Sequence, residues 1–124
     1  MEQLYKIEIN FLRIFLRKME YSDIEIDNML NHLVFIKREI DSVGFYTYIY
    51  ISDFDFSRMK ERYWTGVLGK TKNGILVDLL VFQSNNDLMI EGSTFGDDLY
   101  PANETDYDVS YAENGITLYG TKII

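Results

Sequence analysis

Clustered carboxylates are the side chains of this sequence whose type and spacing could support chemistry. They comprise the adjacent pair Asp97 and Asp98 and the spaced set Glu104, Asp106 and Asp108. On an extended strand Asp106 and Asp108 would share a face, which fits the paired carboxylates of a glycosidase only loosely. Nothing in the sequence places a sugar beside them. We therefore predict a protein that is not an enzyme and has no catalytic residue.

The same segment offers hard oxygen ligands for a calcium ion in the side chains of Asn103, Glu104, Asp106 and Asp108. It lacks the glycine and the terminal bidentate glutamate of the twelve-residue calcium loop. The single imidazole, His32, has no second histidine or cysteine with which to share a metal ion. We interpret it as a packed or capping residue at a helix end. The sequence thus predicts neither a metal site nor a cofactor.

Charge is distributed unevenly along the chain. Residues 1–72 hold 11 acidic and 11 basic side chains, whereas residues 73–121 hold 9 acidic and no basic ones. With Lys122 added, the C-terminal third accounts for the whole net charge of −8. Such a field attracts cationic partners and argues against binding to a nucleic-acid backbone. Solubility alone is the other explanation for it.

A tyrosine strip is the second candidate feature. Tyr46, Tyr48 and Tyr50 alternate with apolar residues in the clearest strand pattern of the chain, so they share one face of that strand. Two interpretations stay open. The rings lie in the core under the N-terminal helix with their hydroxyls at its rim, or Phe45, Ile49 and Ile51 take the core and the tyrosines form an exposed partner-binding strip.

The elements that must position these residues are helices followed by hairpins. Apolar residues at three- and four-residue steps predict a helix over residues 2–19, and a shorter helix over residues 23–31 begins after a capping Ser22 or Asp23. Strands are expected at 33–40, 45–52, 63–70, 75–83, 88–95, 107–112 and 116–121, with hairpin turns at Asn73-Gly74 and Asn114-Gly115. The short connections favour antiparallel pairing. The fold class is therefore α+β, with N-terminal helices packed on an antiparallel sheet of five or six strands.

Composition sets the outer limits of the prediction. With 124 residues, 47% of them apolar and 15% aromatic, the chain is suited to one domain (residues 1–124) with a large core. The absence of cysteine excludes disulfides and thiol chemistry. Neither a signal peptide nor an apolar run long enough to span a membrane is present. We expect a cytoplasmic location and no membrane partner.

Several segments resemble small bacterial domains of unassigned function. They are Asn28-Met29-Leu30, Phe45-Tyr46-Thr47-Tyr48-Ile49, residues 74–82, and Leu88-Met89-Ile90-Glu91-Gly92. Some of these domains resemble immunity proteins of polymorphic toxin and contact-dependent inhibition systems, which are small, acidic and diverse in fold. The resemblance implies a binding protein without catalytic residues.

Two classes of function follow from these features. The first is an interaction protein that blocks a basic, nuclease-type toxin; its expected partner-binding residues are Asp97, Asp98, Glu104, Asp106, Asp108, Tyr46, Tyr48 and Tyr50. The alternative is a small-ligand or enzymatic domain in which sheet and helix enclose a pocket lined by those tyrosines and Trp64. Self-association through an edge strand or through Ile123-Ile124 is a third hypothesis.

Overall fold

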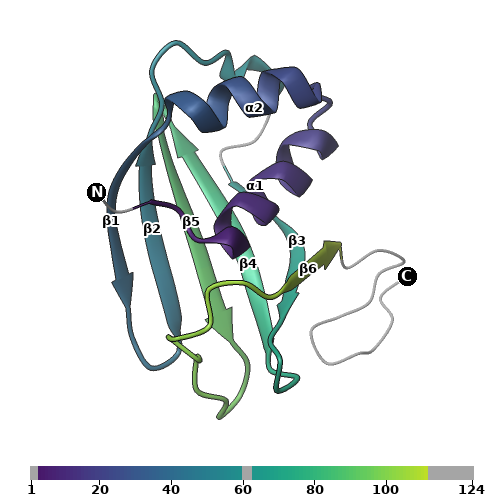
Figure 1. Cartoon of the computed structure of the whole chain (residues 1–124), viewed down its shortest axis with the longest axis vertical. Coiled ribbons are helices and arrows are strands. Elements are labelled where there is room, and N and C mark those ends of the chain that lie inside the picture. The colour runs from purple at the N-terminus through teal and green to yellow at the C-terminus, as the bar shows by residue number, and fades with distance from the viewer. Residues whose placement is uncertain (1–2, 60–62, 112–124) are drawn as a thin grey trace.

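The computed structural model of the protein describes residues 3–59 and 63–111. Two helices precede a six-stranded antiparallel sheet of order β1-β2-β5-β4-β3-β6 (Figure 1). The fold class expected from the sequence is therefore confirmed. The expected Asn114-Gly115 hairpin and the last predicted strand lie outside the described residues. The elements are α1 Lys6–Lys18, α2 Asp23–His32, β1 Val34–Ile40, β2 Gly44–Tyr50, a 3-10 helix Phe56–Arg58, β3 Tyr63–Lys70, β4 Leu76–Ser84, β5 Asp87–Thr94 and β6 Asp108–Tyr111.

Capping interactions fix where the helices begin. The Tyr5 backbone N–H donates to Glu8 Oε1 at 2.6 Å, so α1 starts at Lys6 rather than at residue 2 as predicted. Before α2, Ser22 Oγ accepts from the Glu25 backbone N–H at 3.1 Å, and Glu25 Oε1 accepts from the Ser22 backbone N–H at 2.9 Å. These reciprocal bonds satisfy backbone donors that a helix start leaves without partners. The predicted cap at Ser22 is confirmed.

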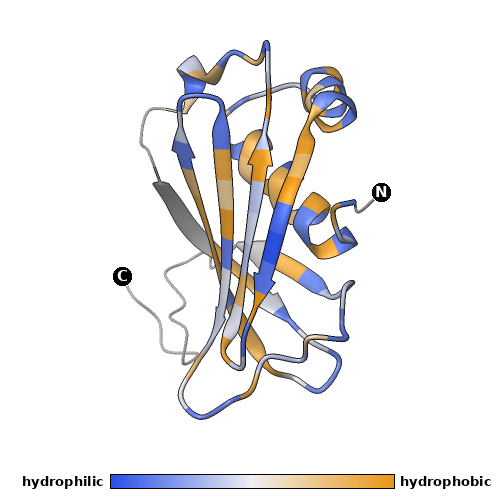
Figure 2. Cartoon of the chain, turned by 90° about the vertical axis from the view of Figure 1, so that its left-hand side faces the viewer, coloured by the Kyte–Doolittle hydropathy of each residue, from blue (hydrophilic) through white to orange (hydrophobic). Residues whose placement is uncertain are grey.

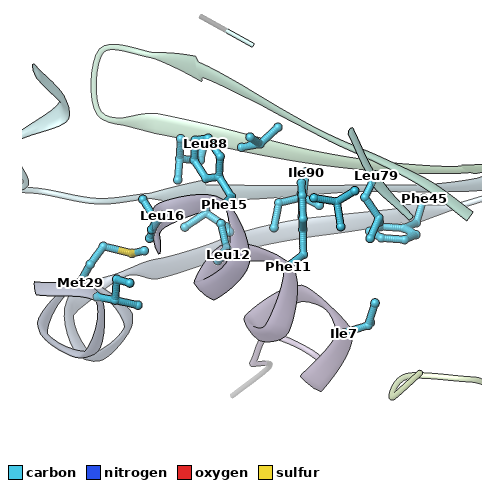
Figure 3. Close-up of a cluster of buried hydrophobic side chains, with 14 of the residues drawn as sticks. Ile7, Phe11, Leu12, Phe15, Leu16, Met29, Phe45, Leu79, Leu88 and Ile90 are labelled. Atoms are coloured by element: carbon cyan, nitrogen blue, oxygen red, sulfur yellow. The ribbon is translucent and has the colours of Figure 1, made fainter. Parts of the chain in front are cut away.

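The core lies between the helices and one face of the sheet. Phe11 and Phe15 of α1 are fully buried, as are Leu79 and Ile90 of the central strands (Figure 3). α2 contributes Met29 to the same cluster. Since apolar burial contributes roughly 25 cal/mol per Å², this continuous contact is the main source of stability.

The segment between β5 and β6 covers the part of this inner face that α1 leaves open. Its residues Tyr100 and Tyr107 are buried, and their hydroxyl oxygens lie 2.8 Å apart in a hydrogen bond. The Tyr100 ring centroid lies 5.4 Å from that of Phe45 on β2. The Ile7 backbone N–H donates to the Thr105 carbonyl at 3.1 Å, which joins the segment to α1. Although Tyr100 lies between two predicted strands, it is therefore part of the core.

Candidate binding surface on the open face of the sheet

The two faces of β2 differ sharply in their surroundings. Phe45, Thr47 and Ile49 point into the core and are buried, whereas Tyr46 and Tyr50 are 36% and 38% exposed. Both helices lie on one side of the sheet (Figure 2). The alternating burial along β2 turns the tyrosines to the other side. The interpretation that placed the tyrosines in the core under the N-terminal helix is therefore wrong. The exposed strip is the arrangement found.

Alternate residues of the neighbouring strands extend this strip into a surface. Tyr48 lies opposite Met89 of β5, and Met89 lies opposite Phe82 of β4, so three apolar side chains form a row across three strands. Phe82 is 36% exposed. We call the outward side chains of β1, β2, β5 and β4 the open face: Lys37, Glu39, Tyr46, Tyr48, Tyr50, Asp78, Leu80, Phe82, Met89 and Glu91.

A hollow of about 540 Å³ lies at one end of the open face, beside the turn between β4 and β5. Ile36, Tyr48, Phe82 and Met89 are among the residues that line it, and most of its surface is apolar. The hollow opens to solvent rather than into the core. Its size and lining suit an apolar side chain of a bound partner.

Charged residues hold the tyrosine rings in place. The Tyr46 hydroxyl donates to Glu91 Oε1 at 3.0 Å, and this bond is the main reason why the pKa of Tyr46 is raised. The ammonium nitrogen of Lys37 lies 4.7 Å from the centre of the Tyr48 ring and 3.6 Å from a Glu39 carboxylate oxygen. A hydrogen bond with Glu39 raises the pKa of Tyr48. The rings are thus oriented before any partner arrives, which lowers the entropy cost of binding.

Asp78 is the most perturbed carboxyl group of the open face. Burial raises its pKa from 3.8 to about 6, and the nearby carboxylate of Glu91 adds to the effect. Within the described residues, no lysine or arginine nitrogen lies within 4 Å of either carboxylate. Asp78 and Glu91 therefore place negative charge on this surface without a compensating cation from residues 3–59 and 63–111.

The acidic residues predicted between β5 and β6 are placed differently. Asp97 and Asp98 are exposed at the turn that follows β5. Glu104 accepts a hydrogen bond from the Lys72 backbone N–H at 3.0 Å. A carboxylate oxygen of Asp106 lies 3.9 Å from the ammonium nitrogen of Lys6 on α1.

Asp108 lies opposite Lys70 in the pairing of β3 with β6. A lysine ammonium thus lies near Asp106 and a lysine stands opposite Asp108 in the register, whereas Lys72 contacts Glu104 only through its backbone.

The predicted acidic residues and tyrosines do not form one continuous surface. Tyr100 and Tyr107 hold the β5–β6 segment on the helix side of the sheet, whereas Tyr46, Tyr48 and Tyr50 lie on the opposite side. The expectation of a single docking patch that combines both groups is corrected on this point. Anchoring the segment by two buried rings decides its side of the sheet, and that long-range packing is not visible in the local sequence.

Two further expectations can be compared with the geometry. The prediction of a pocket between helix and sheet lined by the three tyrosines is wrong, because they point away from the helices. The side chain of Trp64 lies outside the described residues.

In the described part of the chain no group of three or more histidine or acidic side chains could hold a metal ion. The calcium hypothesis therefore gains no support. His32 is exposed in the last turn of α2, with its Nδ1 2.7 Å from the Asn28 carbonyl oxygen, as a capping role requires.

Sequence reasoning missed a buried ion pair as well as the carboxylates of the open face. Glu8 accepts hydrogen bonds from Arg38 and from the Thr47 hydroxyl, and the side chains of Glu8 and Arg38 are 0% and 7% exposed. The guanidinium carbon of Arg38 also lies 3.6 Å from the centre of the Tyr5 ring. This network ties α1 to β1 and β2. For the open face a signal did exist, since Asp78 interrupts an otherwise apolar strand.

No protein-family model matches the chain, and no curated protein or solved structure matches it significantly. In the part of the chain that the structure describes, the helices are too short and too polar to cross a membrane. Any conclusion about function therefore depends on the open face itself.

Proposed function

We propose that the protein is a non-enzymatic interaction protein whose open face binds a basic protein. The observation that carries the proposal is a row of aromatic and apolar side chains beside two carboxylates, Asp78 and Glu91, that no cation of the described chain approaches. Aromatic anchors next to a hollow are typical of the energetic centre of an interface. Carboxylates at the same place favour a partner that presents lysine or arginine.

Asp78 supports a cationic partner for a separate reason. Its raised pKa means that its charge destabilises the free protein near neutral pH. A lysine or arginine side chain brought close to Asp78 and Glu91 would favour the charged form and remove that penalty. Residues that lower the stability of a free protein are common at sites used for binding.

A nuclease-type toxin is the kind of basic partner that we infer. The resemblance of several segments to bacterial immunity proteins favours it, and so does the net charge of −8. A nuclease needs a positive cleft to hold a phosphate backbone, and a surface with aromatic anchors and carboxylates is suited to block such a cleft. In this proposal the protein inhibits by occupying the cleft and transforms no substrate.

The test uses three forms of the full chain as bait in extracts of the native cell at low salt. They are the wild type, the double variant Tyr46→Ser/Tyr50→Ser, and the control Ile24→Ser, which removes a side chain 82% exposed on α2, away from the open face. We expect the wild type and the control to capture the same basic protein and the double variant to lose it. Equal capture by all three forms, or capture of an acidic partner, would contradict the proposal.

A further inference from the structure

β1 forms one edge of the sheet. It pairs with β2 alone among the described strands, so one row of its backbone N–H and C=O groups faces outward (Figure 1). Three aliphatic side chains of the strand are well exposed: Val34 at 50%, Ile36 at 55% and Ile40 at 40%. An exposed edge with aliphatic side chains is a template for pairing with another strand.

A β-bulge limits the part of this edge that can pair regularly. The register with β2 shifts between Phe35 and Lys37, so Ile36 has no partner on β2. A bulge bends its strand and disturbs the ladder locally. The regular edge therefore runs from Lys37 to Ile40.

The charges of this regular edge are self-complementary. Lys37 and Glu39 lie on the same side of the strand and are 58% and 57% exposed. If two copies of β1 pair antiparallel around Arg38, each Lys37 lies opposite Glu39 of the second copy, and this happens twice by symmetry. Arg38 at the centre points inward, where Glu8 compensates its charge.

We propose that a second copy of this chain adds its β1 to the edge, in antiparallel register around Arg38. The two sheets then continue into one another. Face-to-face association of two open faces is disfavoured, because it would bring Asp78 and Glu91 against their equivalents. The edge contact uses Lys37 and Glu39 at the margin of the open face and leaves its tyrosines, Phe82 and Met89 free for the proposed partner.

Sedimentation equilibrium of the full chain over a range of concentrations tests this contact. The wild type is expected to form a reversible dimer that dissociates on dilution, since the regular contact is short. Glu39→Lys places like charges opposite each other at both symmetric positions, and so does Lys37→Glu. Each single variant should raise the dimer dissociation constant by at least about tenfold. The double variant Lys37→Glu/Glu39→Lys restores both pairs and should restore the dimer.

Two control variants separate this contact from other causes. Asp97→Lys makes the same change in net charge as Glu39→Lys at an exposed turn outside β1 and should leave the dimer intact. Tyr46→Ser should also leave it intact, because Tyr46 lies on β2 and takes no part in the edge contact. The proposal is overturned by a wild type that stays monomeric at all concentrations, or by a double variant that fails to regain the dimer. It is equally overturned if Asp97→Lys or Tyr46→Ser dissociates the dimer as strongly as Glu39→Lys.

Discussion

A single carboxyl group, Asp78, shows how one residue can set the pH dependence of stability. Its pKa in the folded protein is raised to about 6, mainly by burial and then by Glu91. Between pH 3.8 and about pH 6 the folded state therefore binds the Asp78 proton more tightly than the unfolded state does. The group thus lowers stability as pH rises through this window, and its full penalty is present above pH 6.

Asp78→Asn removes this penalty. We expect the variant to be more stable than the wild type at neutral pH by about 1–2 kcal/mol, below the value for a fully buried group because Asp78 is partly exposed. The gain should vanish below pH 4, where the wild-type carboxyl is protonated in both states. Urea unfolding at several pH values measures the difference. A variant with the same advantage at every pH would contradict the assignment.

The buried pair of Glu8 and Arg38 gives the second prediction at this scale. Arg38→Met should lower the free energy of unfolding by about 3–5 kcal/mol, because the Glu8 carboxylate stays buried without its cation. Arg17→Met breaks an exposed pair with Asp23, in which Nε and Oδ1 are 3.0 Å apart, and should cost at most about 1 kcal/mol. Thermal or urea unfolding of both variants provides the comparison. Equal losses would show that burial of the Glu8–Arg38 pair is unimportant.

The sequence does not predict which charged residue of β1 turns inward. The strand has three consecutive charged residues, Lys37, Arg38 and Glu39. Arg38 is the one that turns inward because it pairs with Glu8, 30 residues earlier on α1. A contact of that separation leaves no local pattern. Asp78 is different, because a charged residue within an apolar run indicates a strand with one uncovered face.

At the scale of elements, local patterns predicted where strands and turns lie but not which face of β2 is buried. Alternation placed Tyr46, Tyr48 and Tyr50 together correctly. The face of β2 that turns inward is set by packing against α1. The apolar side chains of α1 leave room for Phe45, Thr47 and Ile49, whereas tyrosine hydroxyls on that face would lose their contact with water. The Asn73-Gly74 turn could be predicted because such turns need a positive φ, which glycine adopts at little cost. Gly74 has a φ of +82°.

The pairing of β2 with β5 depends on the absence of a side chain at Gly92. A Cβ atom there would lie 2.2 Å from a ring carbon of Phe45, its partner in the register. Gly92→Ala should therefore lower the free energy of unfolding by about 1–3 kcal/mol through overpacking. Combining it with Phe45→Leu should cost less than the sum of the two single changes, because the smaller side chain makes room. Strict additivity in urea unfolding would refute this steric account.

For the whole molecule, charge and aromatic anchors should act on different stages of partner binding. Long-range attraction governs how fast a cationic partner arrives, whereas close contacts govern how long it stays. We expect Asp97→Lys/Asp98→Lys to slow association severalfold with little change in dissociation, and added salt to slow it further. Tyr46→Ser should mainly speed dissociation. Surface plasmon resonance with the captured basic protein measures both rates, and the reverse assignment of effects would contradict the proposed division.

Methionine methyl groups provide the most direct test of the open face, because they report from different parts of the molecule. Met89 lines the hollow of the open face, whereas Met29 is buried with α2 in the core and Met19 lies at the end of α1. The measurement is a methyl NMR titration of the full chain with the captured basic protein. We predict that the Met89 signal shifts while those of Met19 and Met29 stay in place. A shift at Met19 with an unchanged Met89 would place the partner on the helix side and contradict the central claim.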